Sequence, residues 1–468
     1  MRAGNFAVAV GFIAAGCFGK GDAPAAKEVR LVPPLQRGAW TFYGRGQGLS
    51  DDVQDVSADE GGNVYVAGGD ALYAKKPGSP AFLRFDAANA GLTRNCNDYS
   101  EYFNETPAKP FYTCRVLAVA GAAPGTAIIG FDSFNIEPQT GANWTYHAGG
   151  ADVVAFDPAK GTAARMRHVW FAAPPHTICT KPVYGRTTTC DPTDYWWFAG
   201  RRVFVRVRRL VVNHDRSSPL YGDAWAGGQH ATLAALLANA GARGYFDRTA
   251  GWGLEWEDAK DTWEHEHPNL NPPDGTFVNG EGWGLSIDPR DGMPWGSNEY
   301  RIEVIGGYGA NLSNDSWWAA AKHDIWPDPA PDTPDTPADD HVRSISFCRD
   351  GTLWIGSLTH GLARMDPAGR VTYPALPDAA SGVSTVACDP SDASVWIGLA
   401  AGGVLRLRDG SVERIDATGW PTFAQNPVQS IQIDAWSATR TVYFAFRPLT
   451  DDQGAIQAGG GVAAYAGP

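Results

Sequence analysis

Four polar residues stand at matching places in the sequence and together could carry out chemistry. They are Asp70, His230, Asn298 and His360, and each follows a short apolar stretch that contains a tryptophan or a tyrosine. Imidazoles and a carboxylate bind divalent metals and transfer protons near neutral pH. Each of the four side chains can instead cap the tight turn in which it stands. The sequence therefore leaves two interpretations open, a shared site or four separate turn caps.

An enzyme has little further support in the sequence. We find no serine-nucleophile motif, no paired-carboxylate motif and no phosphate-binding loop. The enzyme that remains compatible is a metal-assisted hydrolase or lyase that uses His230 and His360 across a shared site. The sequence thus assigns no catalytic residue, metal ligand or cofactor, leaves a divalent metal open, and favours a binding protein over an enzyme.

Aromatic and basic side chains provide further candidates for binding. Tyr195, Trp196 and Trp197 are consecutive and can form a platform for a sugar or a protein, or can pack over the edge of a sheet. Arginines alternate with valines between residues 202 and 208, which predicts one strand with a cationic face.

Six cysteines predict a set of disulfide bonds: Cys96, Cys114, Cys179, Cys190, Cys348 and Cys388. An even number of cysteines in an exported chain is typical of a disulfide framework. Short spacing favours the pairs 96–114 and 179–190, and the repeat described below favours the pair 348–388. Zinc and redox chemistry are not expected, because no two cysteines have CxxC spacing.

The N-terminus predicts export and attachment of a lipid. An apolar run over residues 6–15 is too short to span a bilayer but fits a signal peptide. The string AAGC, which ends at Cys17, resembles a bacterial lipobox. The resemblance implies a signal peptide over 1–16, lipidation of Cys17 and a flexible tether over 17–38. Phe18 rather than Asp follows the cysteine, which by similarity to other lipoproteins favours sorting to the outer membrane. The alternative is a plain secretory signal with an incidental cysteine.

Net charge limits the possible partners. The chain carries a formal net charge of −13. Proteins that bind nucleic acid or anionic lipid surfaces instead present a basic surface. We therefore expect no nucleic-acid partner and contact with the membrane only through the N-terminal lipid. A protein or a glycan in the cell envelope is the expected partner.

A repeat supplies the elements that would position these residues. Residues 339–369 and 381–410 each begin with a valine and a second apolar residue three places later, cross a polar turn and reach the string Trp-Ile-Gly. A further apolar strand follows in both. Residues 48–75 have the same skeleton. Each unit therefore predicts three or four short strands joined by turns.

Fainter copies bring the count to seven units, at 114–131, 205–236, 282–300 and 427–446. Seven all-β units, each with one aromatic strand centre, predict a single β-propeller of seven blades over residues 39–468. The chain is longer than seven ordinary blades. We therefore expect loop insertions at 87–112, 174–200 and 232–280, and a Pro/Asp-rich linker between two blades at 326–340.

Closure of the propeller can also be predicted. Residues 39–43 form an apolar strand ahead of the first unit, and the last unit lacks room for an outermost strand. We expect this strand to complete the last blade and hide an exposed edge. In such a ring, the loop after each second strand lies on the same face as the loop into the next blade. That face, the top face, would hold all four polar candidates.

The strings GLS, Trp-Ile-Gly and G-L-x-R at this spacing resemble the repeats called two-component regulator propellers, most strongly over 48–86 and 339–410. Those repeats are common in the periplasmic sensor part of hybrid histidine kinases and in free-standing exported proteins. No kinase or response-regulator segment follows here, so the resemblance implies binding of a ligand or partner. We expect a non-enzymatic, envelope-anchored propeller that binds a protein or glycan through its top face and aromatic insertions.

Overall fold

The computed structural model divides the chain into Met1–Arg30 and a compact unit, Leu31–Pro468. It describes residues 31–93, 95–97, 112–132, 134–137, 145–148, 150–169, 203–231, 240–246, 263–264, 283–297, 302–304, 322–323, 325–326, 340–377, 382–415, 419–436, 439–451 and 454–467. The predicted signal peptide and Cys17 lie outside these residues. No helix within the described ranges is long and apolar enough to cross a bilayer.

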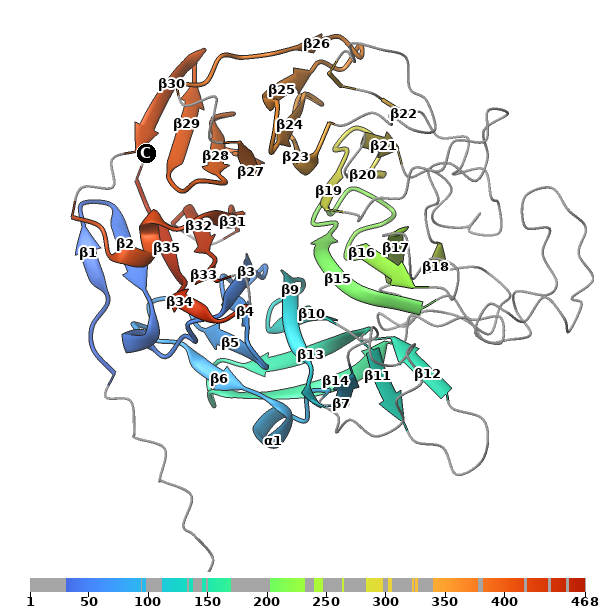
Figure 1. Ribbon diagram of the computed structural model, residues 1–468, viewed down its shortest axis with the longest axis vertical. Helices are drawn as coiled ribbons and strands as arrows, with labels where there is room; N and C mark the ends of the chain where they lie inside the picture. Colours follow the sequence, from blue (N-terminus) through green and yellow to red (C-terminus); the bar gives the residue numbers. More distant parts are fainter. Residues whose placement is uncertain are drawn as a thin grey trace, which may run out of the picture. The chain divides into compact units, whose positions relative to one another are not determined.

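Seven antiparallel sheets of the described residues follow one another around a common centre, as Figure 1 shows. This arrangement is an all-β propeller and confirms the predicted fold class. The first three blades, from inner to outer strand, are β3 (Val53–Ala58), β4 (Val64–Gly68), β5 (Ala71–Lys75) and β6 (Leu83–Phe85); β9 (Arg115–Gly121), β10 (Thr126–Asp132), β13 (Ala151–Asp157) and β14 (Thr162–Val169); and β15 (Val203–Val212), β16 (Ala224–Ala231), β17 (Ala240–Phe246) and β18 (Trp263–Glu264). One bridge, between Asp132 and Arg206, joins the second and third blades.

The remaining four blades complete the ring. They are β19 (Gly284–Ile287), β20 (Pro294–Ser297), β21 (Ile302–Val304) and β22 (Lys322–His323); β23 (Val342–Phe347), β24 (Leu353–Ser357), β25 (Gly361–Met365) and β26 (Val371–Thr372); β27 (Val383–Cys388), β28 (Val395–Leu399), β29 (Val404–Arg408) and β30 (Ser411–Ile415); and β31 (Val428–Asp434), β32 (Thr441–Phe446), β35 (Gly461–Tyr465) and β2 (Trp40–Tyr43). Strand β1 (Leu35–Arg37) adds a fifth strand to the last blade.

The Trp-Ile-Gly string has a packing role in the two blades that contain it. Trp396 is fully buried. Gly398 is required two residues later, because a Cβ there would lie 2.6 Å from the Cβ of Val428 in the next blade. Gly356 is in the same situation, with Val383 of the following blade 2.6 Å from an added Cβ. In these two blades, the glycine therefore lets the leading valine of the next inner strand close against the second strand.

Turn chemistry separates the first and second strands. After β23, the Asp350 carboxylate accepts a hydrogen bond from the Thr352 backbone at 2.9 Å. Gly351 between them has a φ of 80°, a left-handed conformation that favours glycine. Aspartate turns also follow two of the third strands. Asp157 and Asp366 each accept two backbone N–H groups within their own turns.

The last blade joins the two ends of the compact unit. Strand β2 pairs antiparallel with β35, with Trp40 opposite Tyr465. The Trp40 ring packs against Trp396, Trp420 and Phe444, at centroid distances of 6.4, 4.6 and 5.3 Å. An N-terminal strand thus forms the outer part of a blade whose inner strands are C-terminal.

Segments outside the blades partly match the predicted insertions. Helix α1 (Ala87–Ala90) follows β6, and β7 (Asn95–Asn97), β8 (Tyr112–Thr113), β11 (Phe134–Glu137) and β12 (Thr145–Ala148) form a small sheet. A hairpin of β33 (Leu449–Thr450) and β34 (Ile456–Ala458) lies within the last blade's connection, and single 3-10 turns occupy Arg45–Gln47 and Thr422–Gln425. The predicted insertion at 232–280 was wrong in part, because β17 and β18 within it are strands of the third blade.

The two ends of the Pro/Asp-rich segment lie next to each other. The backbone N–H groups of Ile325 and Trp326 both donate to the Asp340 carboxylate, at 2.8 and 3.1 Å. All three residues are buried. The two ends of the segment 326–340 are therefore held together between the fourth and fifth blades, and residues 327–339 lie outside the described part.

Candidate binding site in the central channel

The inner strands of the seven blades contribute one residue each at the same position of the repeat. The pairing registers of the inner and second strands align Asp55, Ala118, Arg209, Gly284, Ser344, Thr385 and Ser430. Most of these residues are small or carry a hydroxyl. Two of them, Asp55 and Arg209, carry opposite charges. We call this set the channel ring.

Hydroxyl groups at and near the channel ring join neighbouring inner strands. Ser344 Oγ accepts a hydrogen bond from the Val386 backbone at 3.0 Å, and Ser430 Oγ accepts one from Val56 at 3.2 Å. Such bonds satisfy N–H groups of strand edges that would otherwise face the channel. These serines therefore act first as links between blades.

Asp55 performs the same linking role with a full charge. Its Oδ2 accepts a hydrogen bond from the Val119 backbone at 3.0 Å, and its Oδ1 accepts one from Val56 at 2.9 Å. The residue is 4% exposed. Burial raises the pKa of the Asp55 carboxyl above its usual value, and Arg209 and the hydrogen bonds from Ser430 and the backbone offset part of that effect.

Arg209 reaches from the third blade across the channel to three other blades. Its Nη1 lies 3.6 Å from Asp55 Oδ1, its Nη2 donates to the Gln429 carbonyl at 3.4 Å, and its Nε donates to the Trp283 carbonyl at 3.5 Å. All three distances exceed the ~2.8 Å of a strong charge-assisted hydrogen bond. Arg209 is thus placed inside the channel but only loosely bound there.

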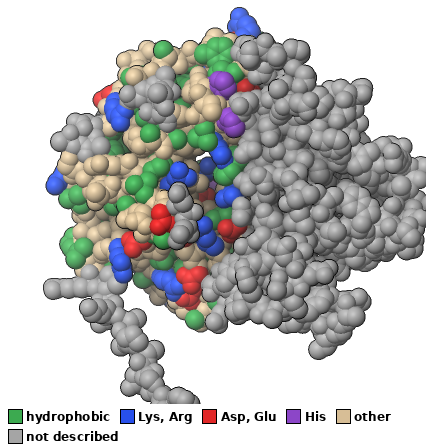
Figure 2. Space-filling model, viewed as in Figure 1, with side chains coloured by type: hydrophobic (Ala, Val, Ile, Leu, Met, Phe, Trp, Pro, Cys, Tyr) green, Lys and Arg blue, Asp and Glu red, His purple; other side chains and the backbone are tan. Residues whose placement is uncertain are grey.

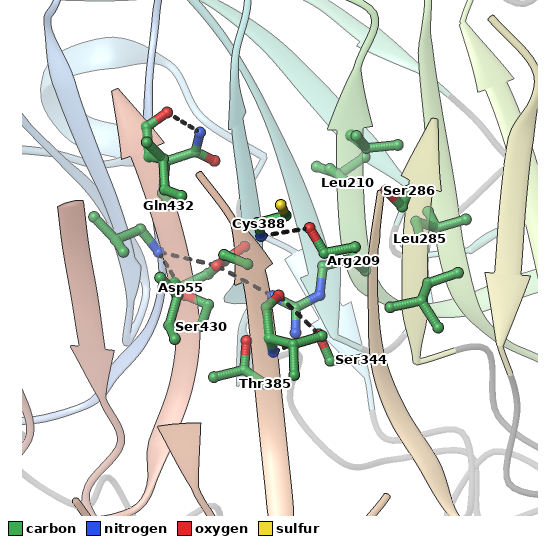
Figure 3. Close-up of a pocket in the computed structure, with 18 of the residues that line it drawn as sticks. Asp55, Arg209, Leu210, Leu285, Ser286, Ser344, Thr385, Cys388, Ser430 and Gln432 are labelled. Carbon is green, nitrogen blue, oxygen red and sulfur yellow. Dashed lines mark hydrogen bonds and ion pairs between the residues drawn. The ribbon is translucent and has the colours of Figure 1, made fainter. Parts of the chain in front are cut away.

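The channel ring surrounds a cavity of about 230 Å³. Figure 3 shows the side chains of Asp55, Arg209, Ser344 and Thr385 gathered in this space. Residues of all seven inner strands line the cavity, from Asp55 in the first blade to Gln432 in the last. The cavity is therefore a property of the closed ring, because no single blade builds it.

A tryptophan lies between two arginines, beside the channel ring in sequence. Arg208, Trp283 and Arg343 each precede the channel-ring residue of the third, fourth and fifth blades. The guanidinium carbons of Arg208 and Arg343 lie 4.8 and 3.6 Å from the centroid of the Trp283 ring. Such cation–π contacts help to hold arginine side chains in place. Figure 2 shows Lys and Arg side chains near the centre of its view.

A second polar cluster lies where the inner strands end. Glu60, which follows β3, accepts hydrogen bonds from Tyr221 at 2.6 Å and Arg216 at 3.0 Å, and its Oε1 lies 3.2 Å from His214 Nδ1. The His214 ring lies 4.2 Å from that of Trp436 in the last blade. These hydrogen bonds, the one with His214 foremost, lower the pKa of Glu60 to about 2. The cluster joins the first, third and seventh blades.

The four polar candidates from the sequence occupy different environments. The Asp70 carboxylate accepts a hydrogen bond from Arg84 Nη2 of its own blade at 2.7 Å. The backbone N–H of His360 donates to Ser357 Oγ at 2.9 Å, and its ring stacks on Trp326 with centroids 5.3 Å apart. Within the described residues, no group of three His, Cys, Asp or Glu could hold a metal ion. The His230 side chain and Asn298 lie outside the described residues.

The disulfide predictions are tested only in part. Cys348 and Cys388 form a bond between the fifth and sixth blades, with Cα atoms 5.2 Å apart, which confirms that pair. Cys114 is disulfide-bonded. Cys96 lies in β7, opposite Tyr112 in the neighbouring strand. A disulfide bond between Cys96 and Cys114 stays a prediction. Cys179 and Cys190 lie outside the described residues, as does the aromatic run Tyr195, Trp196 and Trp197.

Sequence reasoning missed the charged pair of the channel ring. The signal that could have found it is the repeat itself, because Asp55 and Arg209 stand where the units at 339–369 and 381–410 have Ser344 and Thr385. The cationic strand was predicted from the arginines between 202 and 208. The packing of Arg343 on the same tryptophan ring as Arg208 was not predicted.

No protein-family model matches the chain, and no curated protein matches it either. Among solved structures, the chain is similar to virginiamycin B lyase from Staphylococcus aureus at 10% identity and a TM-score of 0.45, over 91% of this chain and 98% of that one. It is also similar to YCF48 bound to a D1 peptide, at 13% identity and a TM-score of 0.45, over 96% and 100% of the two chains. The extracellular domain of the hybrid two-component system BT3049 from B. thetaiotaomicron is 13% identical, with a TM-score of 0.47, over 93% and 42%. Identities and scores this low carry no statement about ligand or activity.

Proposed function

We propose that this protein is a non-catalytic binding module of the bacterial cell envelope, which holds a protein or glycan ligand at the top face of its propeller. The observation that carries the proposal is the cavity of about 230 Å³ in the channel, with its lining of hydroxyl, amide and charged side chains. A mostly pre-formed concave site with a few placed polar groups is the usual form of a ligand site.

The end of the cavity where the inner strands begin belongs to the top face. There the backbone of Val116, in the second blade, donates to the Gly69 carbonyl in the turn of the first blade at 2.8 Å. Turns after second strands therefore lie beside the starts of the next inner strands. Arg208, Trp283 and Arg343 precede the channel ring in three blades, and their packed side chains would form part of this face.

The contacts of Asp70 and His360 support binding over catalysis. Metal-assisted hydrolysis needs several ligands within a few ångströms of one point. Asp70 binds Arg84, and the His360 ring packs on Trp326. A hydrolase or lyase would have to draw the remaining ligands from His230 and Asn298.

Thermal unfolding in the presence of envelope glycans and peptides tests the proposal. A ligand at 100 times its dissociation constant stabilises the folded state by about 2.7 kcal/mol, which a melt detects readily. We expect at least one glycan or peptide to raise the Tm, and chelator and divalent metals to leave it unchanged. A metal-dependent rise that is lost in His230→Ala or His360→Ala would favour the enzyme instead.

Attachment to the envelope is a separate part of the proposal. Lipidation of Cys17 would place the wild-type protein in the membrane fraction and release Cys17→Ala to the soluble fraction. Equal membrane recovery of the two proteins would contradict the lipid anchor and leave the binding function untouched.

A further inference from the structure

The cavity in the channel lies between two contacts that cross the ring. Towards the starts of the inner strands, Arg209 of the third blade reaches the carbonyls of Trp283 and Gln429, in the fourth and seventh blades, at 3.5 and 3.4 Å. Beyond the strand ends, the ring centroids of His214 in the third blade and Trp436 in the seventh lie 4.2 Å apart. Those two blades are not neighbours, so both contacts cross the channel. A group that enters past the weakly held Arg209 therefore meets a floor.

The charges that line the cavity cancel. Among the described lining residues, Asp55 and Arg209 are the two that carry a full charge, and Asp55 Oδ1 lies 3.6 Å from Arg209 Nη1. An ion in the cavity would be attracted by one member of this pair and repelled by the other. Little is then gained to offset the loss of the ion's hydration. An uncharged polar group loses far less on leaving water, so the cavity favours a neutral ligand.

Three hydroxyl groups that line the cavity have hydrogen-bonding positions that no described residue fills. Ser286 Oγ and Ser346 Oγ accept the backbone N–H groups of Phe347 and Cys388 at 3.0 and 2.9 Å, and neither hydroxyl donates to a described residue. Thr385 Oγ1 neither donates nor accepts within the described part of the chain. A hydroxyl offers one donor and two acceptor positions. The fourth, fifth and sixth blades thus offer a ligand three hydroxyl donors.

The first and seventh blades complement these hydroxyls. Asp55 presents a carboxylate and Gln432 an amide, and Figure 3 shows both across the cavity from Ser286. Gln432 Nε2 donates to the Ile433 carbonyl at 3.1 Å, which uses one of its two hydrogens. Donors and acceptors therefore lie on different sides of the same space. This arrangement suits a ligand with several hydroxyls, because each ligand hydroxyl both donates and accepts.

The end of a glycan fits this cavity better than the end of a peptide. The volume of about 230 Å³ equals that of about eight water molecules at ~30 Å³ each, which is space for one sugar ring. A glycan can end in an uncharged ring that bears several hydroxyls. Either end of a peptide brings an ammonium or a carboxylate group instead. A closed floor and a lining of zero net charge therefore favour the sugar.

Building on the proposed function, we propose that the channel binds the uncharged terminal sugar ring of a glycan. The sugar lies between Arg209 and the contact of His214 with Trp436. The Thr385 hydroxyl donates to it from the sixth blade, and the Asp55 carboxylate accepts a hydrogen bond from one of its hydroxyls.

Calorimetry on the full chain tests this proposal with sugars that differ mainly in charge. Glucose is compared with glucuronate and glucosamine, and galactose with galacturonate and galactosamine, at a pH where the amines are protonated. We expect at least one neutral hexose to bind. Its acid and its amine should bind about tenfold more weakly or not at all, because neither charge is compensated in the cavity.

One substitution tests the contact itself. Thr385→Val keeps the branched shape of the side chain and removes a hydroxyl that bonds to no described residue, so the fold should be unaffected. Binding of the hexose should weaken by about three- to tenfold, which corresponds to one neutral hydrogen bond. Thr372→Val, at an exposed position of the outer strand β26, is the matched control and should leave binding unchanged.

Variants of the charged pair separate a binding role from a structural one. Asp55→Asn leaves the charge of Arg209 uncompensated and should shift the preference of the channel towards the acid by about tenfold. Arg209→Gln leaves Asp55 uncompensated and should shift the preference towards the amine by a similar factor. A purely structural role would weaken binding of all three sugars alike. If a single variant unfolds, Asp55→Asn/Arg209→Gln removes both charges and should still prefer the neutral hexose.

Several outcomes would overturn the proposal. They are binding of neither hexose, equal binding of the neutral and charged sugars, and undiminished binding in Thr385→Val. A glycan or peptide that raises the Tm of the wild type and of Thr385→Val equally, while neither hexose binds, would refute the channel site and leave the proposed function standing. Failure of the wild type to bind any glycan, peptide or sugar would refute both.

Discussion

Asp55 and Arg209 replace hydroxyl-bearing residues that the same position carries in other blades. Ser344 and Ser430 link inner strands there at low cost, because a hydroxyl is neutral. A buried ion pair loses more hydration than it regains when its geometry is poor, and Arg209 Nη1 lies 3.6 Å from Asp55. The charged pair is therefore a weak means of stabilising the ring, which agrees with a role in binding.

Restoring hydroxyls should show how little the pair stabilises the fold. Because Arg209→Ser leaves the buried Asp55 without its cation, it should destabilise the protein by about 2–4 kcal/mol. Asp55→Ser/Arg209→Ser should recover most of that loss, since serine occupies this position in other blades. Urea unfolding of the two variants and the wild type measures the difference. A double variant no more stable than Arg209→Ser would contradict the argument.

The Glu60 cluster predicts a loss of stability in acid. The folded-state pKa of Glu60 is lowered to about 2 from its ordinary value of 4.5. The stability that this carboxylate contributes is fully present above pH 4.5 and is lost as the pH falls towards 2. We expect that loss to amount to about 2–3 kcal/mol. It should be smaller in Glu60→Gln and unchanged in the exposed control Glu413→Gln, as acid unfolding curves would show.

Among the elements, the second strand of each blade sets the distance to the next blade. Gly356 pairs with Ser344, and an added Cβ would lie 2.6 Å from Val383 Cγ1. Gly356→Ala should therefore destabilise the protein by about 1–3 kcal/mol through overpacking. Gly44→Ala is the matched control, because its nearest neighbour is 3.4 Å away. Equal midpoints of urea unfolding for the two variants would show that neighbouring blades can move apart to accommodate the added methyl group.

The strong repeats made most of the propeller predictable from sequence. Each blade repeats one pattern of apolar spacing, so seven units could be counted and the pair Cys348–Cys388 placed at the ends of neighbouring inner strands. Strand β17 was not predicted because its sequence AGARGYF is rich in Ala and Gly, which are poor strand formers. Contacts across the channel could not be predicted for another reason. Arg209 meets Asp55 only after the ring closes, and no local pattern encodes that approach.

For the molecule as a whole, closure depends on a few residues near its N-terminal end. Trp40 is 8% exposed and packs against rings of both the sixth and the seventh blade. Trp40→Ala should cost about 3–5 kcal/mol, as large truncations in a core do. Met166→Ala, at a residue that is 53% exposed, should cost far less. Thermal unfolding compares them, and similar Tm values would mean that the β2–β35 pairing is dispensable for closure.

The same pairing has a consequence for the order in which the ring can form. If the chain leaves the cytoplasm N-terminus first, β2 emerges early, yet its partner β35 emerges almost last. Until then the edge of β2 that will face β35 has no strand to pair with, and such an edge can pair with another chain. A product cut short before β35 would keep that edge exposed, and this exposed edge would distinguish it from the finished ring for proteases and chaperones.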